Sequence, residues 1–234
     1  MDAKLSLIIF GCGGASIEAY TWIKQMNLSS NKSVFEVLGF VDKDDNQIGK
    51  EIIDGKRVIS NDSQIISFVA GFNEINVVLR LGSPELKSRT YNKISKCYNL
   101  VFPNIVHPSV IYDRNTFYMG KGNIICPGVV AACNLTIGDF NLINRCVTIG
   151  HDVLLGDFNT VNPTSTISGN VCIGNHCLLG ANSTILQDLK ILDETAVGAG
   201  AVVTKEFPSQ SVVMGVPAAI HPNVSSQKVI NEEG

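Results

Sequence analysis

A six-residue period runs through the second half of the chain and constrains its fold more than any other feature. Starting at Met119, an aliphatic side chain or an alanine recurs at every sixth residue up to Val203, which is 14 steps of six without an insertion. Glycine often follows this position, and the side chain four residues after it is mostly small or β-branched. This register is typical of a parallel β-helix, in which each six-residue unit forms one flat side of a coil.

Three such sides make one triangular coil of 18 residues, so the 15 units predict about five stacked coils. We expect the aliphatic position to point inward, while neighbouring coils satisfy each other's backbone groups. The glycine that follows, such as Gly138 or Gly150, is expected at a corner, where the missing Cβ lets the backbone turn without a clash.

The first 105 residues have a different pattern, in which apolar runs alternate with segments of helical spacing. We expect strands at 5–10, 34–41, 75–81 and 100–105, and helices at 15–26, 64–69 and 85–97. Ser83 is a suitable N-cap and Pro84 a suitable first residue for the last helix. Strands separated by helices predict a parallel sheet with helices on its faces, an α/β Rossmann-like domain.

Charge and hydropathy exclude two other classes of protein. The net charge of −3 and the pI of about 5.8 argue against a broad nucleic-acid-binding surface. The mean hydropathy of +0.20 is high, but the best apolar run, Ile124 to Cys133, has ten residues and contains Pro127, whereas a membrane helix needs about 20. Met1 to Lys4 lead at once into a strand-like segment and do not resemble a secretory signal, so we expect a cytoplasmic protein.

The chain has seven cysteines and no CxxC pair. Cys172, His176 and Cys177 lie near each other in the sequence, but their spacing is not that of a zinc site. We therefore expect no metal, and we interpret the cysteines as small, mostly buried side chains in a reducing compartment.

Several motifs spread over almost the whole chain resemble one enzyme family. They are Phe10-Gly11-Cys12-Gly13-Gly14, Gly39-Phe40-Val41-Asp42, Val106-His107-Pro108, His151-Asp152 and Gly215-Val216-Pro217-Ala218. Uninterrupted hexapeptide repeats resemble the left-handed β-helix acyltransferases. Together with the N-terminal motifs, they resemble the sialic acid O-acetyltransferase NeuD family, which includes the PglD-like N-acetyltransferases of nucleotide-linked 4-amino sugars.

The resemblance implies a homotrimer that binds acetyl-CoA between neighbouring subunits and needs no metal. It also implies a nucleotide-sugar-binding domain at 1–105, a linker at 106–118, a left-handed β-helix acetyltransferase domain at 119–207 and a C-terminal tail at 208–234. We expect no contact with nucleic acid and no insertion into a membrane.

His151 and Asp152 are the candidate catalytic residues. His151 follows Ile149 and Gly150, so it should lie at a coil corner and point outward. An amine or hydroxyl that attacks a thioester must lose a proton, and an imidazole accepts one at neutral pH. The resemblance implies that His151 is this base and that Asp152 raises its basicity. Many members have Glu at the second position, and the shorter Asp leaves a direct contact with His151 open; a solvated corner is the alternative for both residues.

A second group of candidates belongs to the acceptor. The glycines of 11–14 follow a strand and open a helix, where backbone amides can approach a phosphate, although Ser16 stands where a dinucleotide fingerprint has its third glycine. The alternative is a plain tight turn. The resemblance implies an acceptor pocket lined by Gly13, Gly14, Ala15, Asp42, Lys43 and Gly82. Asn144 is a further candidate for the acceptor or for His151, but we favour a structural role for it in a coil turn.

The resemblance places acetyl-CoA at Thr160, Ala181 and Ala199. Thr160 stands where relatives have a His, and the two alanines would contribute backbone groups and space. Gly169 is a candidate backbone donor to the oxyanion that forms during acyl transfer. We assign a structural role to His107 and no function to His176 or His221.

Together with this resemblance, the residues lead us to expect an acetyl-CoA-dependent N-acetyltransferase that acts on the amino group, at C4, of a nucleotide-linked sugar in bacterial surface-glycan biosynthesis. Three alternatives stay open. They are O-acetylation of sialic acid or a related sugar, a nicotinamide-dependent oxidoreductase suggested by the N-terminal glycines, and a non-catalytic nucleotide-sugar-binding β-helix protein.

Overall fold

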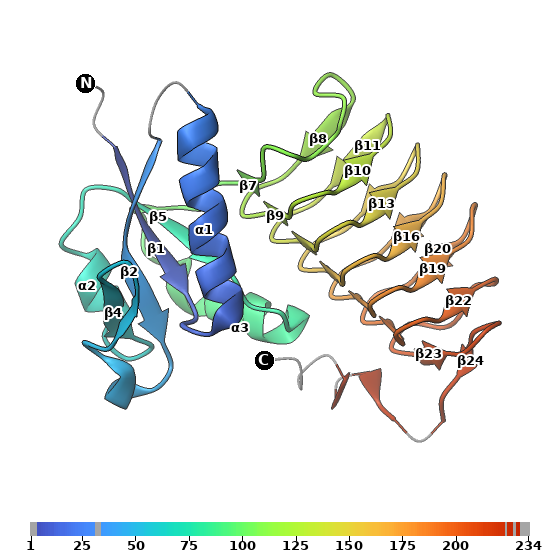
Figure 1. Ribbon diagram of the computed structural model, residues 1–234. Helices are drawn as coiled ribbons and strands as arrows, with labels where there is room; N and C mark the ends of the chain where they lie inside the picture. Colours follow the sequence, from blue (N-terminus) through green and yellow to red (C-terminus); the bar gives the residue numbers. More distant parts are fainter. Residues whose placement is uncertain (1–3, 31–33, 223, 227, 230–234) are drawn as a thin grey trace.

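The computed structural model describes residues 4–30, 34–222, 224–226 and 228–229. Residues 1–3 of the N-terminal segment considered above, and residues 230–234 at the end of the expected tail, lie outside the described residues. The described chain forms an α/β layer structure and a triangular prism of coils that lie side by side (Figure 1).

The N-terminal part is a six-stranded sheet of order β3-β4-β2-β1-β5-β6, parallel except for the β3-β4 hairpin. Its strands are β1 (Leu5–Phe10), β2 (Phe35–Asp42), β3 (Glu51–Ile53), β4 (Lys56–Asn61), β5 (Ile75–Leu79) and β6 (Leu100–Val101), and its helices are α1 (Gly14–Ser29), η1 (Asp45–Gln47), α2 (Ile65–Val69) and α3 (Pro84–Ile94). Leu7 and Ile9 of β1 pack toward α1, whereas the alternate residues Ile8 and Phe10 pack toward α2 and α3. The expected parallel sheet with helices on both faces is confirmed.

Some expected boundaries are wrong. We expected no strands between 42 and 64, where the β3-β4 hairpin lies, and one strand at 100–105, where there are two. Asn104 fixes the turn between the two strands. Its side-chain Nδ2 donates to the carbonyl of Gly120 (2.6 Å), and its Oδ1 accepts from the backbone amide of Asn123 (2.8 Å). The following strand, β7 (Ile105–Val106), therefore pairs with β9 (Ile124–Ile125) in the prism. The division of the chain at 105, 118 and 207 stays a prediction.

The second part is a left-handed β-helix with three faces, each a sheet of parallel strands except for the antiparallel β24. One face holds β7, β9, β12 (Leu142–Ile143), β15 (Thr160–Val161), β18 (Leu178–Leu179), β21 (Ala196–Val197), β23 (Val212–Met214) and the antiparallel β24 (Ala219–Ile220). The second face holds β10 (Val130–Ala131), β13 (Thr148–Ile149), β16 (Thr166–Ile167), β19 (Thr184–Ile185) and β22 (Val202–Val203), and the third holds β8 (Phe117–Met119), β11 (Leu135–Ile137), β14 (Leu154–Leu155), β17 (Cys172–Ile173) and β20 (Lys190–Ile191).

Pairing from β8 to β22 confirms the 18-residue coil, because each strand residue pairs with the residue 18 positions later, as Ile149 does with Ile167. The aliphatic position of each unit is buried in one core cluster, with partly buried Met119 against its end. The prism core is therefore a column of stacked aliphatic side chains.

The corners of the prism depend on a left-handed residue that the sequence analysis did not identify. It recurs every six residues and is mostly not glycine: Asn134, Phe140, Cys146, Asp152, Phe158, Thr164, Asn170, His176, Asn182, Asp188 and Glu194 have φ between 55° and 63°. The glycines two residues earlier serve another purpose. A Cβ on Gly138 would lie 2.0 Å from Oδ1 of Asp157 and 3.0 Å from the backbone of Gly156 in the next coil. These glycines allow coils to approach each other, which corrects the expectation that they provide the turn.

The face that contains β12 and β15, here called the covered face, carries the N-terminal part. Lys87 of α3 is fully buried there, and its Nζ donates to the carbonyls of Phe140 (2.8 Å) and Asn159 (3.1 Å). Burial, followed by the nearby positive charge of Arg80, lowers the pKa of Lys87 to about 7. Lower on the same face, Val224 and Val229 of the tail pack against a cluster of Leu178, Ala196 and Val212. The covered face is thus occupied by segments of its own chain.

Among the described helices, none is both long and apolar enough to cross a membrane.

Candidate functional site

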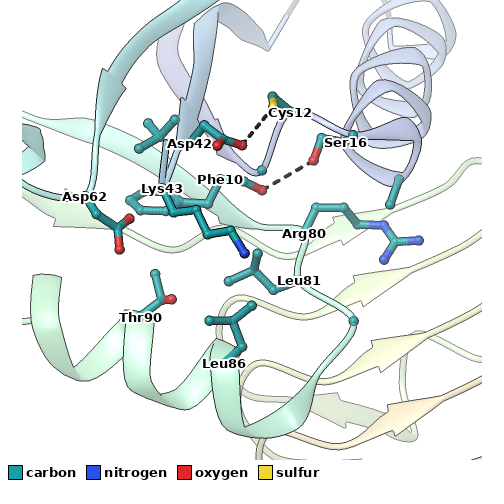
Figure 2. A pocket seen from close by; sticks show the side chains of 15 residues that line it. Phe10, Cys12, Ser16, Asp42, Lys43, Asp62, Arg80, Leu81, Leu86 and Thr90 are labelled. Atoms are coloured by element: carbon teal, nitrogen blue, oxygen red, sulfur yellow. Dashed lines mark hydrogen bonds between the residues drawn. The ribbon is translucent and has the colours of Figure 1, made fainter. Parts of the chain in front are cut away.

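A cavity of about 330 Å³ opens in the N-terminal part, where β1, β2 and β5 end (Figure 2). In an open parallel sheet, ligands bind outside the carboxyl ends of the strands. Five of the six residues expected in the acceptor pocket line this cavity, namely Gly13, Ala15, Asp42, Lys43 and Gly82. The exception is Gly14, which begins α1 beside them. The structure therefore brings together residues that are far apart in the sequence.

Asp42 at the end of β2 is fixed on both of its oxygens. The thiol of Cys12 donates to Oδ2 at 2.7 Å, and the backbone amide of Asp44 donates to Oδ1 at 3.0 Å. Burial, followed by this contact with Asp42, raises the pKa of Cys12 to about 11. Cys12 is therefore a protonated thiol that orients a carboxylate in the cavity, not a nucleophile.

The glycine turn depends on Gly11. Its φ is +95°, and a Cβ there would lie 2.6 Å from Oγ of Ser16, so only glycine fits. Ser16, which replaces the third glycine of the fingerprint, is buried and donates to the carbonyl of Phe10 at 3.4 Å. Gly13 is the N-cap of α1 and no side chain caps the helix, so the first amides of a 16-residue helix lie beside the cavity.

Two cations line the cavity, and the sequence analysis identified only Lys43. Figure 2 shows the Lys43 ammonium extending between Asp62 and Arg80. The Arg80 side chain is 5% exposed, its Nε has no hydrogen-bond partner, and its nearest carboxylate, on Glu18, is 3.7 Å away. Burial lowers the pKa of Arg80 from its ordinary value. Because Arg80 follows the carboxyl end of β5, the strand-end rule that indicated Asp42 could also have identified it.

His151 and Asp152 lie at the prism corner between β13 and β14, here called the His151 corner. The imidazole is 62% exposed, as expected for an outward-pointing side chain, and its Nδ1 lies 2.7 Å from Oδ2 of Asp152. The question left open by the shorter acid is answered, because the two side chains are in direct contact. The bond from His151, followed by one from Asn134 to Oδ1 (3.1 Å), lowers the pKa of Asp152, so the carboxylate is ionised at neutral pH.

Gly169 lies directly beside the imidazole in the next coil. A Cβ on Gly169 would be 2.7 Å from both Cε1 and Nε2 of His151. Asn170 reinforces this stacking, since its backbone amide donates to the His151 carbonyl at 2.8 Å. The absence of a side chain on Gly169 therefore leaves the space that the imidazole occupies.

Thr160 does not lie where a cofactor on the outside of the prism could reach its side chain. It is fully buried, its hydroxyl donates to the carbonyl of Gly82 at 2.7 Å, and Nζ of Lys87 lies 3.5 Å from that hydroxyl. The hydroxyl of Thr160 joins the cavity loop to the prism, so its side chain is not free to contact acetyl-CoA.

Asn144 lies at the corner between the covered face and the second face, one corner before His151. It is buried, and its Oδ1 accepts from the amide of Arg145 at 3.1 Å. The Arg145 guanidinium pairs with Glu18 of α1. In this chain Asn144 has a turn-stabilising contact and no contact with His151, which agrees with the structural role that we favoured.

Ala181 and Ala199 are exposed at that same corner, in adjacent coils, here called the alanine corner. The amide of Gly200 donates to the Ala181 carbonyl at 2.8 Å, and a Cβ on Gly180 would lie 2.5 Å from the Ala199 amide. The corner is therefore narrow and lacks large side chains. It is a different corner from that of His151, so one chain does not bring these three residues together.

The three residues considered for a metal site do not converge. Cys177 points into the prism core, whereas the ring of His176 stacks on Phe158 at the third corner (5.2 Å between centroids). Within the described residues, no group of three His, Cys, Asp or Glu side chains could hold a metal ion. His107, assigned a structural role, bonds Ser109 and Gln25.

No protein-family model and no curated protein matches the chain. Among solved structures, a mutant of perosamine N-acetyltransferase from Caulobacter crescentus, in complex with CoA and GDP-perosamine, has a TM-score of 0.83 and 23% identity, over 94% of this chain and 99% of that one. The acetyltransferase domain of PglB from Neisseria gonorrhoeae FA1090, in complex with acetyl coenzyme A, has 0.81 and 20%, over 94% and 100%. WeeI from Acinetobacter baumannii AYE has 0.78 and 25%, over 93% and 100%. These likenesses show that the fold is shared over nearly the whole chain.

Proposed function

We propose that this protein is an acetyl-CoA-dependent N-acetyltransferase that acts on a nucleotide-linked amino sugar. The observation that carries the proposal is the exposed His151–Asp152 pair, with its Nδ1 to Oδ2 contact of 2.7 Å and its imidazole packed directly beside Gly169. The prism core needs no such pair at an outward corner. The comparison structures with CoA and GDP-perosamine, and with acetyl coenzyme A, support the same class of reaction.

The geometry assigns a role to each atom of the pair. An ionised carboxylate only accepts hydrogen bonds, so the imidazole Nδ1 must carry the hydrogen that it donates to Oδ2 of Asp152. The neutral imidazole then has its lone pair on Nε2, the atom that lies beside Gly169. His151 is therefore in the tautomer that can accept a proton from an attacking group.

In the proposed reaction, the neutral amine of the acceptor attacks the thioester carbonyl carbon and forms a C–N bond. Nε2 of His151 takes a proton from the amine nitrogen. The C–S bond then breaks, CoA leaves as the thiolate, and the imidazolium can return the proton to that sulfur. The amide of Gly169 donates to no carbonyl among the described residues, and we propose it as a donor to the oxyanion of the intermediate.

The cavity suits the nucleotide part of such an acceptor. The amino end of α1 and Lys43 provide donors and positive charge for phosphates, and the buried Arg80 adds to the positive charge nearby. Asp42 can accept from a ribose or a base edge. A hydroxyl of a sugar is the alternative acceptor for the same base. The bound GDP-perosamine of the comparison structure is an amino-sugar nucleotide and favours the amine.

We further propose that the active unit is a homotrimer with each site shared between two chains. The cavity lies against the covered face, through the contact of Gly82 with Thr160 on β15, whereas the His151 corner lies between the other two faces. A second chain is needed to bring a His151 corner to a cavity and to an alanine corner. A closed cyclic assembly provides this arrangement three times.

The test is an assay of free thiol release from acetyl-CoA with a panel of nucleotide-linked amino sugars, matched hydroxy sugars and the free sugars. We expect turnover with an amino-sugar nucleotide, with an acetamide as product by mass spectrometry. Transfer to a hydroxyl alone would replace the N-acetyltransferase with an O-acetyltransferase. Binding of the nucleotide sugars without any transfer would support the non-catalytic alternative.

A further inference from the structure

A column of alternating amide and carboxylate side chains follows the His151 corner. Asn134, Asp152, Asn170 and Asp188 are spaced by 18 residues, so they lie in successive coils, and each has φ between 58° and 63°. The amide Nδ2 of Asn134 donates to Oδ1 of Asp152 at 3.1 Å, and that of Asn170 donates to Oδ1 of Asp188 at 2.8 Å. The column thus contains two similar amide–carboxylate pairs.

The two pairs differ in what precedes the acid. His151 precedes Asp152 and bonds its second oxygen, whereas Gln187 precedes Asp188. In the first pair the carboxylate therefore has Oδ1 on Asn134 and Oδ2 on the imidazole. An Asp carboxylate on an exposed corner can otherwise rotate about its side-chain bonds, and Asn134 opposes that rotation.

We infer that Asn134 is a positioning residue that holds Asp152 so that His151 keeps its proton on Nδ1 and its lone pair on Nε2. This inference rests on the proposed function of His151 as a base. Asn134 has no contact with His151 itself, so it acts through the carboxylate. The series of hydrogen bonds from Asn134 through Asp152 to the imidazole links two adjacent coils, since Asn134 belongs to the coil before that of Asp152.

The structure also explains how Asp152, although its side chain is shorter than that of Glu, reaches the imidazole of His151. The backbone amide of Asp152 donates to the carbonyl of Cys133 at 3.1 Å, which fixes Asp152 directly under Asn134. With the backbone held and one oxygen bound from the previous coil, the other oxygen faces the neighbouring side chain of the same corner. The same two constraints act on Asp188, which accepts from the side chain of Asn170 and whose amide donates to the Gly169 carbonyl at 3.2 Å.

Asn134→Gly tests the inference without strain, because glycine adopts positive φ readily. Asn134→Asp keeps the shape but replaces the donor by an acceptor that repels Asp152. Asn170→Gly is the matched control, since it removes the equivalent bond to Asp188 at the same backbone conformation.

The direct readout is the ¹⁵N NMR spectrum of the imidazoles, which distinguishes a proton on Nδ1 from one on Nε2. The chain has four histidines, and the His151→Ala spectrum assigns the signal. We expect the Nδ1–H form of His151 to dominate in the wild type and to decrease in both Asn134 variants but not in Asn170→Gly. We expect kcat to fall about five-fold in Asn134→Gly, as for the loss of one hydrogen bond, and further in Asn134→Asp, with no change in Asn170→Gly.

An unchanged tautomer in both Asn134 variants would overturn the inference, whatever the activity. Equal changes in Asn134→Gly and Asn170→Gly would also overturn it, because they would indicate a general effect on the corner. The NMR result does not depend on the reaction, so it is separate from a failure of the proposed function, which would appear as a fully active His151→Ala variant.

Discussion

The cavity and the His151 corner fix their polar groups in opposite ways. In the cavity, burial is the main constraint: Arg80 is nearly inaccessible, and Asp42 is held by the protonated thiol of Cys12. At the corner the side chains are exposed, with Asp152 at 50%, and hydrogen bonds along the stack of coils hold them. The difference fits the proposed division of labour, in which an enclosed site would select a large polar ligand and an open edge would present a base to a second chain.

Loss of the base should have the largest effect and should be confined to the corner. In His151→Ala we expect kcat to fall by 10²- to 10⁴-fold, the usual contribution of a positioned base. The side chain points out of the core, so the melting temperature and the KM for acetyl-CoA should change little. Steady-state kinetics and thermal denaturation test this. A folded variant with more than about half of the wild-type kcat, with chemistry rate-limiting, would remove His151 from the mechanism.

Displacing the base should have the next largest effect. In Gly169→Ala the new Cβ would lie 2.7 Å from Nε2 of His151, so the ring must move. We expect kcat to fall roughly ten- to hundred-fold, since a displacement of about 1 Å can have such an effect. Gly156→Ala is the control, because its Cβ would strain the stack of coils against Gly174 without touching His151. It should lower the melting temperature with a smaller change in kcat. The reverse order of kcat effects would contradict this account of the corner.

Blocking the cavity should affect only the acceptor. A Cβ on Gly13 meets no atom within 4 Å, so Gly13→Phe can place its ring at the cavity without straining the turn. We expect the KM for the nucleotide sugar to rise about ten-fold or more, while the KM for acetyl-CoA stays within about two-fold. Kinetics with each substrate varied in turn measure both values. Equal increases would contradict the separation of the two binding regions.

The contact between the N-terminal part, which forms the cavity, and the covered face of the prism should make the stability of the protein depend on pH through Lys87. Its pKa of about 7 in the folded protein lies below the ordinary 10.5, so the unfolded chain binds more protons between these values. The free energy of unfolding should therefore rise with pH from about 7 upward, relative to Lys87→Met, by about 1 kcal/mol per pH unit. Urea denaturation between pH 7 and 9 measures the difference. The exposed Lys96→Met variant should run parallel to the wild type. Parallel curves for Lys87→Met and the wild type would contradict the lowered pKa of Lys87.

The β-helix could be predicted from the sequence because its core is repeated. One inward side chain every six residues specifies the faces, the 18-residue coil and the corner position of His151, without any long-range knowledge. The N-terminal part has no such repetition. The turn at Asn104 was missed because it depends on contacts 16 and 19 residues away. The β3-β4 hairpin is local, and its Asp54-Gly55 turn, a typical hairpin signal, was overlooked. The burial of Thr160 could not be predicted either, because only its packing against Lys87 and Gly82 shows it.

The site was predictable in part. Strand ends identified Asp42 and Lys43, but Arg80 was missed at the end of β5, where the same rule applies. Asn134 was missed because its contact lies 18 residues away, although the coil length predicted from the period would place it over Asp152.

The central claim, that each site combines the cavity of one chain with the His151 corner of another, is tested most directly by mixing two variants, each impaired in one part of the site and assayed at limiting acceptor. His151→Ala retains the cavity, and Gly13→Phe retains the base. In a shared-site trimer, every mixed assembly has one site with both parts intact, so co-assembly in equal amounts should restore about a quarter of the wild-type activity at limiting acceptor. Mixed trimers that form, as shown by native mass spectrometry, and yet stay at the activity of the parent variants would contradict the account and place cavity and base within one chain.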